Sequence, residues 1–397
     1  MTNTTTDIQN ISDCITYCKY QYNKVIKLSS VQTFFIESSD AENTWSKVKS
    51  FLFVKLTTND GIDGWGEAFT EEGKEMNIIN YIHNFAEMIP NINSVTPWNF
   101  LNLISKDKKN TINTCHASAR SAFEMALWDI YAKKANKSLS QLIGVKRKSS
   151  VSVYANIWSN KHYSDNDIVK KAKNVIKLGY RAIKIYPLQN RSISQAASLM
   201  KLLRSKLGKE IHILLDLECP SSVNDAINLE PLISPYNPYW YEEPFDGLNI
   251  KKLASITNQS SFDIVTGERQ CGIDHFVNVI NSQAAQILNP DISMAGGILD
   301  ILVIAKLAHE NNIRISPHCW NSMTISVAAM LQICSVLPNA EMAELFPDFM
   351  THSNQFMSSR YKITNGKIEV PDNLGLGIDM NEDIIIEKSS NTRLSSM

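Results

Sequence analysis

The chain has 397 residues, more than a single hydrophobic core usually organises, so two domains are expected. A hydrophobic fraction of 44%, a charged fraction of 20% and a net charge of −1 are ordinary for a globular protein and give no reason to expect nucleic acid or an anionic membrane as a partner. No apolar stretch reaches the roughly 18 residues of a membrane span or forms a secretory signal, and the seven cysteines lie mostly in apolar segments, which favours a cytoplasmic protein with reduced thiols.

The first 150 residues predict a polar extension and then an α+β domain. Residues 1–25 are polar and are expected to form a weakly ordered extension. Two strands, a turn and a tight bend are expected in the next part of the chain, at residues 27–36, 51–56, 58–61 and 64–67. Residues 72–137 have a helical pattern, with apolar side chains at helical spacing around Ala122 and Ala126. We therefore assign residues 26–150 to one α+β domain.

From Val151 onward, strands alternate with helices, which predicts an α/β barrel of parallel strands over residues 151–350. One return helix is expected to begin at Ser164 or Asp165 and to end at Gly179. The expected strands are residues 151–156, 181–186, three runs that end at 216, 242 and 268, and then 284–291, 313–318 and 342–346. Residues 351–397 are expected to return to the first domain.

Three acidic residues, Asp216, Glu242 and Glu268, lie 26 residues apart, and each closes a short apolar run. A buried parallel strand has this pattern, and a strand with its return helix takes roughly 25–30 residues. The spacing therefore predicts that three neighbouring strands bring their carboxylates to one rim of the barrel. Three buried anions repel one another unless a cation joins them, and oxygen ligands favour Mg²⁺, with Mn²⁺ as the alternative, over zinc.

The other barrel strands also end in ionisable side chains, which stability alone does not require. These side chains are Lys184 with Tyr186, Asp291, His318 and Glu344. Because Asp291 ends the strand before that of His318, we expect its carboxylate to bond one ring nitrogen of the histidine. Such a contact fixes the tautomer and raises the basicity of the other nitrogen, as a general base requires.

The remaining polar groups at this rim have two interpretations each. Lys184 is either a structural amine beside the carboxylates or a cation that holds a substrate carboxylate. Tyr186 either packs or exchanges protons through a phenol whose pKa the metal and the ammonium lower. Glu344 is expected to donate a hydrogen bond if burial keeps it protonated. Glu218 and Glu243 are interpreted as salt-bridged groups rather than as supports for the metal ligands.

Taken together, these residues resemble the enolase superfamily in its mandelate racemase subgroup, from about residue 27 onward. Each matching stretch alone is weak evidence for the family, but the stretches together form a specific pattern. They are residues 61–67, 126–130, 179–184, 216, 242–244, 267–268, 290–291, 296–297, 316–318 and 344. The resemblance implies a (β/α)7β TIM-like barrel with an N-terminal α+β capping domain. It also implies Mg²⁺ bound by Asp216, Glu242 and Glu268, a small-molecule carboxylate as substrate, and a homo-oligomer.

Two strand ends distinguish subgroups within that resemblance. The muconate-lactonizing and enolase subgroups place a catalytic lysine where this chain has Asp291, followed by His318 on the next strand. Many members have Lys-x-Lys on the second strand, whereas this chain has Lys184 and Tyr186. Racemisation needs acid–base groups on both faces of the enolate, and dehydration proceeds with fewer. The resemblance therefore implies Mg²⁺-dependent dehydration of a sugar acid, an aldonate or aldarate, to a 2-keto-3-deoxy acid through an ene-diolate.

Alternative functions stay open at this point. A racemase, an epimerase or a sugar-lactone cycloisomerase would use the same enolate. The three carboxylates argue against a Schiff-base aldolase acting through Lys184, and residues 151–156 lack the His-x-His of an amidohydrolase. A binding protein would have little use for both a metal triad and a His–Asp pair. Substrate identity is expected in loops near residues 38–47, with Trp45 and Lys47, and 68–73, while Trp320 and Asn321 either line the pocket or cap the next helix.

Overall fold

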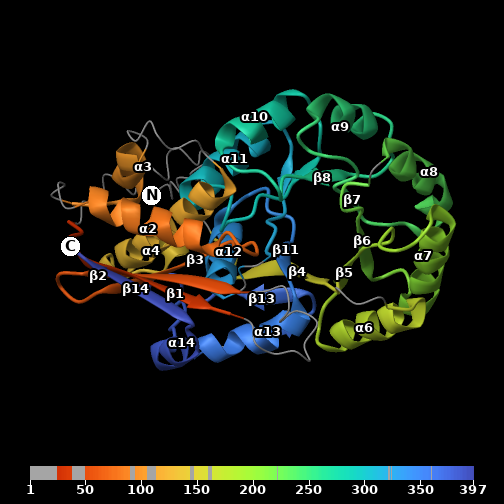
Figure 1. The fold of residues 1–397 in the computed structure, drawn as a ribbon. Coiled ribbons are helices and arrows are strands. Elements are labelled where there is room, and N and C mark those ends of the chain that lie inside the picture. Colours follow the sequence, from red (N-terminus) through yellow and green to blue (C-terminus); the bar gives the residue numbers. More distant parts are fainter. Residues whose placement is uncertain are drawn as a thin grey trace, which may run out of the picture.

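The structure, a computed structural model, describes residues 25–37, 50–89, 94–104, 113–143, 147–159, 163–220, 222–320, 322, 324–358 and 360–397. A ring of strands and outer helices forms one part of the molecule, and a sheet with packed helices forms the other (Figure 1). Within these ranges, no helix combines the length and the apolar character that crossing a bilayer requires.

The smaller part is an antiparallel sheet covered by helices. The sheet has the strand order β14-β1-β2-β3, with strands β14 (Asn391–Ser396), β1 (Leu28–Ile36), β2 (Phe51–Thr58) and β3 (Asp63–Ala68). Its helices are α2 (Glu75–Met88), α3 (Pro97–Ile104), α4 (Thr114–Lys134) and α5 (Leu139–Ile143). The end of the chain thus returns to this part, since Ser395 pairs with Val31.

Residues 64–67, which the sequence predicted as a tight bend, belong to strand β3, so that prediction was wrong. The two glycines serve close packing rather than a turn. An added Cβ at Gly66 would lie 1.9 Å from the carbonyl oxygen of Ala122, and one at Gly64 would lie 2.2 Å from that of Ala126. Helix α4 therefore lies directly against the backbone of β3, which only glycine permits.

The larger part is a barrel of parallel strands closed on itself. In order around the barrel, the strands are β4 (Ser150–Asn156), β5 (Ala182–Ile185), β6 (His212–Asp216), β7 (Tyr241–Glu242), β8 (Ile264–Thr266), β9 (Ile287–Leu288), β10 (Arg314–Ile315) and β11 (Ala343–Leu345). Strand β11 pairs in parallel with β4, and a parallel bridge between Ile315 and Ala340 closes the remaining gap. The hairpin β12 (Ile363–Thr364) and β13 (Lys367–Glu369) extends this sheet from β4.

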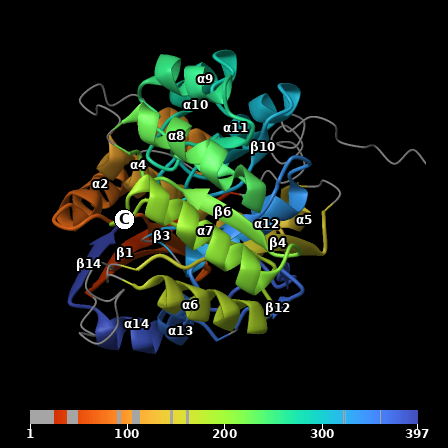
Figure 2. The same cartoon turned by 90° about the vertical axis from the view of Figure 1, so that its right-hand side faces the viewer.

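The connecting helices surround the barrel (Figure 2). They are α6 (Asp165–Lys177), α7 (Ile193–Leu207), α8 (Val223–Ile233), α9 (Ile250–Thr257), α10 (Ile273–Asn281), α11 (Ile298–Glu310) and α12 (Ile325–Val336). The short helix η1 (Ser234–Tyr236) follows α8 within the barrel. The described C-terminal region adds α13 (Pro347–Ser353), the short helix η2 (Asn354–Phe356) and α14 (Glu382–Lys388). Of the two expected start residues, Ser164 caps α6, with a reciprocal contact to Asp167, and Gly179 follows the end of the helix with a positive φ.

Several barrel strands are shorter than their apolar runs. Residues 284–291 contain only Ile287–Leu288 as strand, and residues 313–318 only Arg314–Ile315. The amides of Asn289 and Ser316, just after these short strands, still donate to the neighbouring strand, and Asp291 and His318 beyond them pair at the rim. The loop after β3, with Phe69 and Glu71, and the start of α4 at Thr114 reach this rim, and the candidate site lies there.

Candidate active site and metal centre

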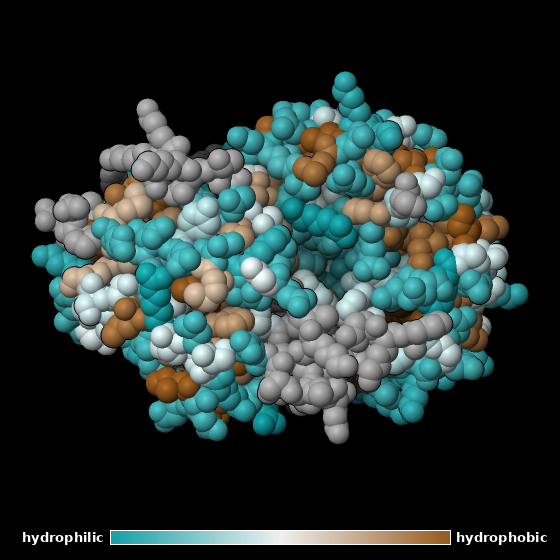
Figure 3. Space-filling model, in the orientation of Figure 1, coloured by the Kyte–Doolittle hydropathy of each residue, from teal (hydrophilic) through white to brown (hydrophobic). Residues whose placement is uncertain are grey.

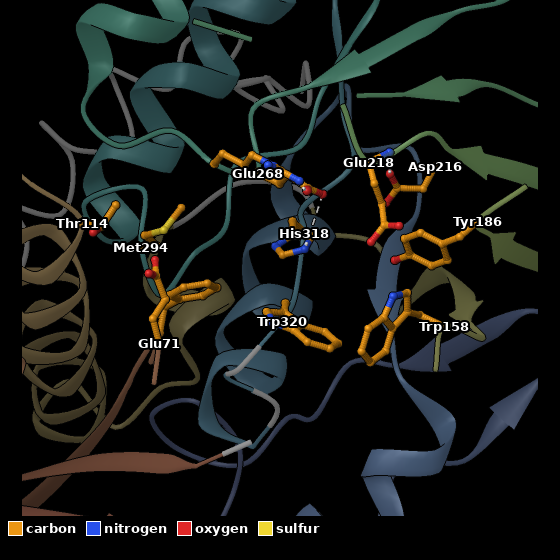
Figure 4. Close-up of a pocket in the computed structure, with 12 residues that line it drawn as sticks. Glu71, Thr114, Trp158, Tyr186, Asp216, Glu218, Glu268, Met294, His318 and Trp320 are labelled. Carbon is orange, nitrogen blue, oxygen red and sulfur yellow. Dashed lines mark hydrogen bonds and ion pairs between the residues drawn. The ribbon is translucent and has the colours of Figure 1, made fainter. Parts of the chain in front are cut away.

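A cavity of about 430 Å³ opens at the C-terminal rim of the barrel, next to the smaller part of the molecule. The space-filling view shows a hollow with mostly hydrophilic surroundings between the two parts (Figure 3). The close-up shows Glu71 and Thr114 of the smaller part, with Met294 of the barrel, on the side opposite Tyr186 and Asp216 (Figure 4). The lining residues are Phe69, Glu71, Thr114, Trp158, Tyr186, Asp216, Glu218, Glu268, Arg269, Met294, His318 and Trp320.

The three evenly spaced carboxylates lie together at this rim. Asp216 ends β6 and pairs in register with Glu242 at the end of β7. Glu268 stands two residues beyond the end of β8, because the chain turns at Gly267, whose φ is +131° and whose Cβ would lie 2.7 Å from the ring of Phe276. One oxygen from each carboxylate lies within 4.8 Å of the others. The sequence spacing therefore corresponds to a spatial cluster.

This cluster has the chemistry of a divalent cation site. Burial and the neighbouring carboxylates raise the pKa of Glu242 well above its usual value and that of Glu268 to about 7, so the cluster resists holding its negative charge. Among the described groups, the Oε2 atoms of both glutamates are buried without a hydrogen-bond partner. A hard cation with oxygen ligands would satisfy both the charge and the orphaned oxygens, so the residues present fit Mg²⁺ or Mn²⁺.

Lys184 lies beneath the cavity rather than on its surface. Its side chain is fully buried, and its Nζ atom is 2.7 Å from Glu242 Oε1, 2.7 Å from Glu344 Oε1 and 3.3 Å from Asp216 Oδ2. These carboxylates raise the pKa of the amine against the opposing effect of burial, so the ammonium is favoured. Of the two interpretations of Lys184, the geometry favours the amine that neutralises the strand-end carboxylates.

His318 and Asp291 form the expected pair. The Nδ1 atom of His318 lies 2.8 Å from Asp291 Oδ2, and the backbone amides of Ser293 and Trp320 donate to the same carboxylate. With Nδ1–H donating to Asp291, Nε2 carries the second proton of the imidazolium or the lone pair of the neutral ring, and it lies 3.5 Å from Glu268 Oε2. Burial lowers the pKa of His318, but the carboxylates around it more than offset that effect and raise the pKa to about 9.

Tyr186 follows the end of β5 and lines the cavity (Figure 4). The sequence-based interpretation expected the metal and ammonium to lower the pKa of its phenol. In this structure burial raises the pKa well above its usual value, and the Lys184 ammonium lowers it, as expected, without outweighing burial. The effect of a bound metal stays a prediction. The side-chain amide of Asn156 donates to the phenol oxygen at 2.7 Å, which leaves the phenol's own proton available to a ligand.

Glu344 accepts hydrogen bonds and does not donate them. Burial alone would raise its pKa, but Lys184 and His318 outweigh that effect and lower it, which corrects the expectation of a protonated acid. Its Oε1 atom accepts from Asn156 Nδ2 at 2.8 Å, and its Oε2 atom accepts from the amide of Cys319 at 2.9 Å. Glu344 thus holds the segment that carries His318.

The two acidic residues that follow metal-ligand candidates differ in position. Glu218 has a positive φ and lines the cavity beside Asp216 (Figure 4). Glu243 is buried and accepts from Thr266 Oγ1 at 3.0 Å and from the amide of Gly267 at 3.1 Å. Neither has a salt bridge among the described contacts, so the salt-bridged interpretation is replaced. Glu243 supports the turn that presents Glu268.

Sequence reasoning missed several residues of this site. Asn156, which bridges Tyr186 and Glu344, ends the first barrel strand and was findable by the same strand-end rule. Asn289, which donates to Glu242 Oε1 at 3.0 Å, follows the end of β9 and carried no comparable signal. Of the predicted specificity loops, residues 68–73 contribute Phe69 and Glu71, and Trp320 lines the cavity. Residues 38–47, with Trp45 and Lys47, as well as residues 1–24 and Asn321, lie outside the described residues.

Two family models match the chain. Residues 39–144 match the model for the N-terminal domain of mandelate racemase and muconate lactonizing enzyme. Residues 167–384, more than half of the chain, match the model described as enolase C-terminal domain-like. The two matches fall on the smaller part of the molecule and on the barrel with the segment that follows it.

Individual proteins agree with those models along nearly the whole chain. A D-gluconate/D-galactonate dehydratase of Picrophilus torridus is 27% identical over 375 residues, which is 90% of this chain and 93% of the relative. A D-galactonate dehydratase of Klebsiella pneumoniae is 25% identical and covers 87% of this chain and 93% of its own. The crystal structure of an enolase from the environmental genome shotgun sequencing of the Sargasso Sea is 38% identical, with a TM-score of 0.89 over 95% of this chain and 100% of that one.

Proposed function

Since the chain belongs to the mandelate racemase and muconate lactonizing enzyme family of the enolase superfamily, we propose that it dehydrates a sugar acid. The substrate is an aldonate or aldarate, the product is a 2-keto-3-deoxy acid, and the reaction passes through an ene-diolate and depends on Mg²⁺. The relatives named as sugar-acid dehydratases support this hydro-lyase activity. The observation that carries the proposal is the pairing of His318 with Asp291 beside the three-carboxylate cluster.

The carboxylate cluster would hold the metal. Asp216, Glu242 and Glu268 are the proposed ligands, and the buried ammonium of Lys184 offsets part of their charge from below. A divalent ion bound there would stabilise the negative charge that develops on the carboxylate oxygens when the substrate loses its α-proton. Stabilising this charge is the main energetic requirement of the reaction. Manganese satisfies the same ligand set.

His318 is the proposed base. Asp291 holds its Nδ1–H, and the Nε2 atom faces the cavity. A cation bound to Glu268 would offset the negative charge that raises the pKa of the ring, and the neutral ring could then accept the α-proton of the substrate at Nε2. The resulting imidazolium is stabilised by Glu268 and Glu344, whose oxygens lie 3.5 and 3.7 Å from Nε2. The same group then returns the proton to the departing β-hydroxyl, and water leaves.

Tyr186 is the proposed hydrogen-bond donor on the barrel wall. Asn156 fixes the phenol oxygen, so its proton points toward a bound ligand rather than toward the protein. This arrangement provides one acid–base group and one neutral donor rather than two matched bases. It favours elimination over racemisation, which requires proton transfer on both faces of the enolate.

The proposal is tested by replacing His318 with Asn, which keeps the size of the side chain and removes the base. Wild-type protein incubated with Mg²⁺ and a panel of aldonates and aldarates is expected to form keto acid, and the variant is expected to lose about 10²–10⁴-fold in kcat. Unchanged turnover by the variant would contradict the role of His318. Solvent deuterium incorporation into recovered substrate without loss of water would instead identify an isomerase.

A further inference from the structure

The cavity has two ends of different chemistry. At the barrel end lie the carboxylate cluster, Tyr186 and His318, where the reacting end of a sugar acid would sit (Figure 4). At the opposite end lie Glu71, in the loop after β3, with Thr114 at the start of α4 and Met294. The opposite end of the cavity would contact the group at the far end of the sugar acid, away from its reacting carboxylate. The side chains there would therefore select the terminal group of the substrate.

We propose that Glu71 makes the enzyme selective for monocarboxylic sugar acids, the aldonates, over dicarboxylic aldarates. This inference rests on the proposed function and deepens it. Among the described residues that line this end of the cavity, none is basic, and Glu71 places a carboxylate there. A carboxylate only accepts hydrogen bonds, so it pairs with the terminal hydroxyl of an aldonate and opposes the terminal carboxylate of an aldarate.

One cation near Glu71 would attract an anion, and Glu71 already neutralises it. Lys74 forms an ion pair with the Glu71 carboxylate, and Lys74 itself is not among the lining residues. Helix α4 begins at Thr114 on this side of the cavity, and the backbone amide of His116 in its first turn already donates to the side chain of Asn113 at 2.9 Å. A second substrate carboxylate would have to displace Glu71 from the favourable position, which is the origin of the discrimination.

The aromatic side chains of the cavity favour a substrate that has a carboxylate at one end only. Trp158 and Trp320 meet edge to face, with ring centroids 5.1 Å apart, and both line the cavity, Trp158 beside Tyr186 and Trp320 nearer to Glu71 (Figure 4). Their apolar surfaces suit the C–H bonds of a polyol chain and offer little compensation to a second anion. Arg269 also lines the cavity, but its Nε atom lies 3.6 Å from Glu268 Oε1, at the end where the reacting carboxylate would bind.

The test compares binding of an aldonate with that of the aldarate of matching stereochemistry, by titration calorimetry in saturating Mg²⁺. Every protein titrated, including the one that is wild-type at residue 71, also carries His318→Asn so that the ligand is not turned over. Wild-type protein is expected to bind the aldonate about 10-fold or more tightly, a difference of about 1.4 kcal/mol. Glu71→Gln, which keeps the shape and removes the charge, is expected to reduce that ratio at least about fivefold, and Glu71→Lys to reverse it. Glu72→Gln is the matched control, since Glu72 is exposed and is not among the lining residues, and it should keep the wild-type ratio.

Binding and turnover separate the two proposals. If wild type binds aldarates as well as aldonates, or if Glu71→Gln and Glu72→Gln give the same ratio, selection by Glu71 is wrong whether or not keto acid forms. If the binding ratios behave as expected but no member of the panel yields keto acid, the dehydratase function fails while the selection stands. Equal melting temperatures of the variants would verify that each is folded.

Discussion

The carboxylate of Glu67, on strand β3, accepts a hydrogen bond from the backbone amide of Ser326 at 2.9 Å, in the first turn of barrel helix α12. The amide of Thr324 donates to the same oxygen at 2.9 Å, and the Ser326 hydroxyl at 3.0 Å. A side chain of the smaller domain therefore caps a helix of the barrel, which otherwise lacks a side-chain cap from its own N-cap residue. Helix α12 follows the segment that carries His318, so this contact ties the two parts of the molecule together beside the site.

Replacing Glu67 with Gln is expected to lower the free energy of unfolding by about 3 kcal/mol, because buried amides lose a charged acceptor. Urea unfolding at neutral pH measures the change. Glu72→Gln, at an exposed position a few residues away, should stay within about 0.5 kcal/mol of wild type. Equal losses in the two variants would show that the cap contributes nothing.

Binding of Mg²⁺ is expected to depend on the carboxylate cluster. At a concentration 100 times its Kd, the ion should stabilise wild-type protein by about 2.7 kcal/mol, and Asp216→Asn or Glu242→Gln should abolish most of that increment. Thermal unfolding with and without Mg²⁺ measures the effect independently of activity. Glu369→Gln, on the exposed side of β13, serves as the control with an unchanged increment. A persistent increment in the Asp216 and Glu242 variants would place the ion elsewhere.

Tyr186→Phe is expected to distinguish the proposed role of Tyr186, a hydrogen-bond donor, from that of His318, the base. The variant lacks the donor on the barrel wall, so keto-acid formation should fall by about 10²–10³-fold. Exchange of the α-proton with solvent deuterium, followed by NMR, should continue because His318 remains. Tyr163→Phe, which alters a tyrosine outside the cavity lining, should leave both rates unchanged. Loss of exchange in Tyr186→Phe would make the tyrosine the base.

The acid stability of the protein is expected to depend on His83. This buried histidine of α2 contacts Thr33 of β1 and Ser395 of β14, and burial, with a smaller effect of Arg393, lowers its pKa to about 4. Its neutral form is favoured in the folded state, whereas the unfolded state takes up a proton near pH 6.5. Stability should therefore fall as the pH drops from about 6.5 toward 4, by up to about 3 kcal/mol from this group.

Urea unfolding at several pH values tests that expectation. A His83→Gln variant has no group that titrates in this window at this position, so its stability should depend less steeply on pH between 6.5 and 4. The absolute stability of the variant is not the readout, since the substitution also changes the contacts with Thr33 and Ser395. Parallel pH profiles for the two proteins would assign the acid sensitivity to other groups.

Sequence patterns determined the barrel and the position of its charged rim. Asp216 and Glu242 close apolar runs one strand-and-helix unit apart, and parallel strands must present their ends at the same edge. The pairing of Asp291 with His318 followed from the same rule applied to the next two strands. These features depend on local periodicity and on the geometry of a parallel sheet, both of which a single sequence encodes.

Only the tertiary structure decided how those groups ionise and which of them face a ligand. Lys184 lies beneath the cavity and contacts three carboxylates, of which Glu344 is one. Glu71, from the smaller domain, lines the opposite end of the cavity. A pKa depends on burial and on distances of a few ångströms to charges that are far apart in the sequence. Those distances exist only after the barrel has closed and the smaller domain has packed over its rim.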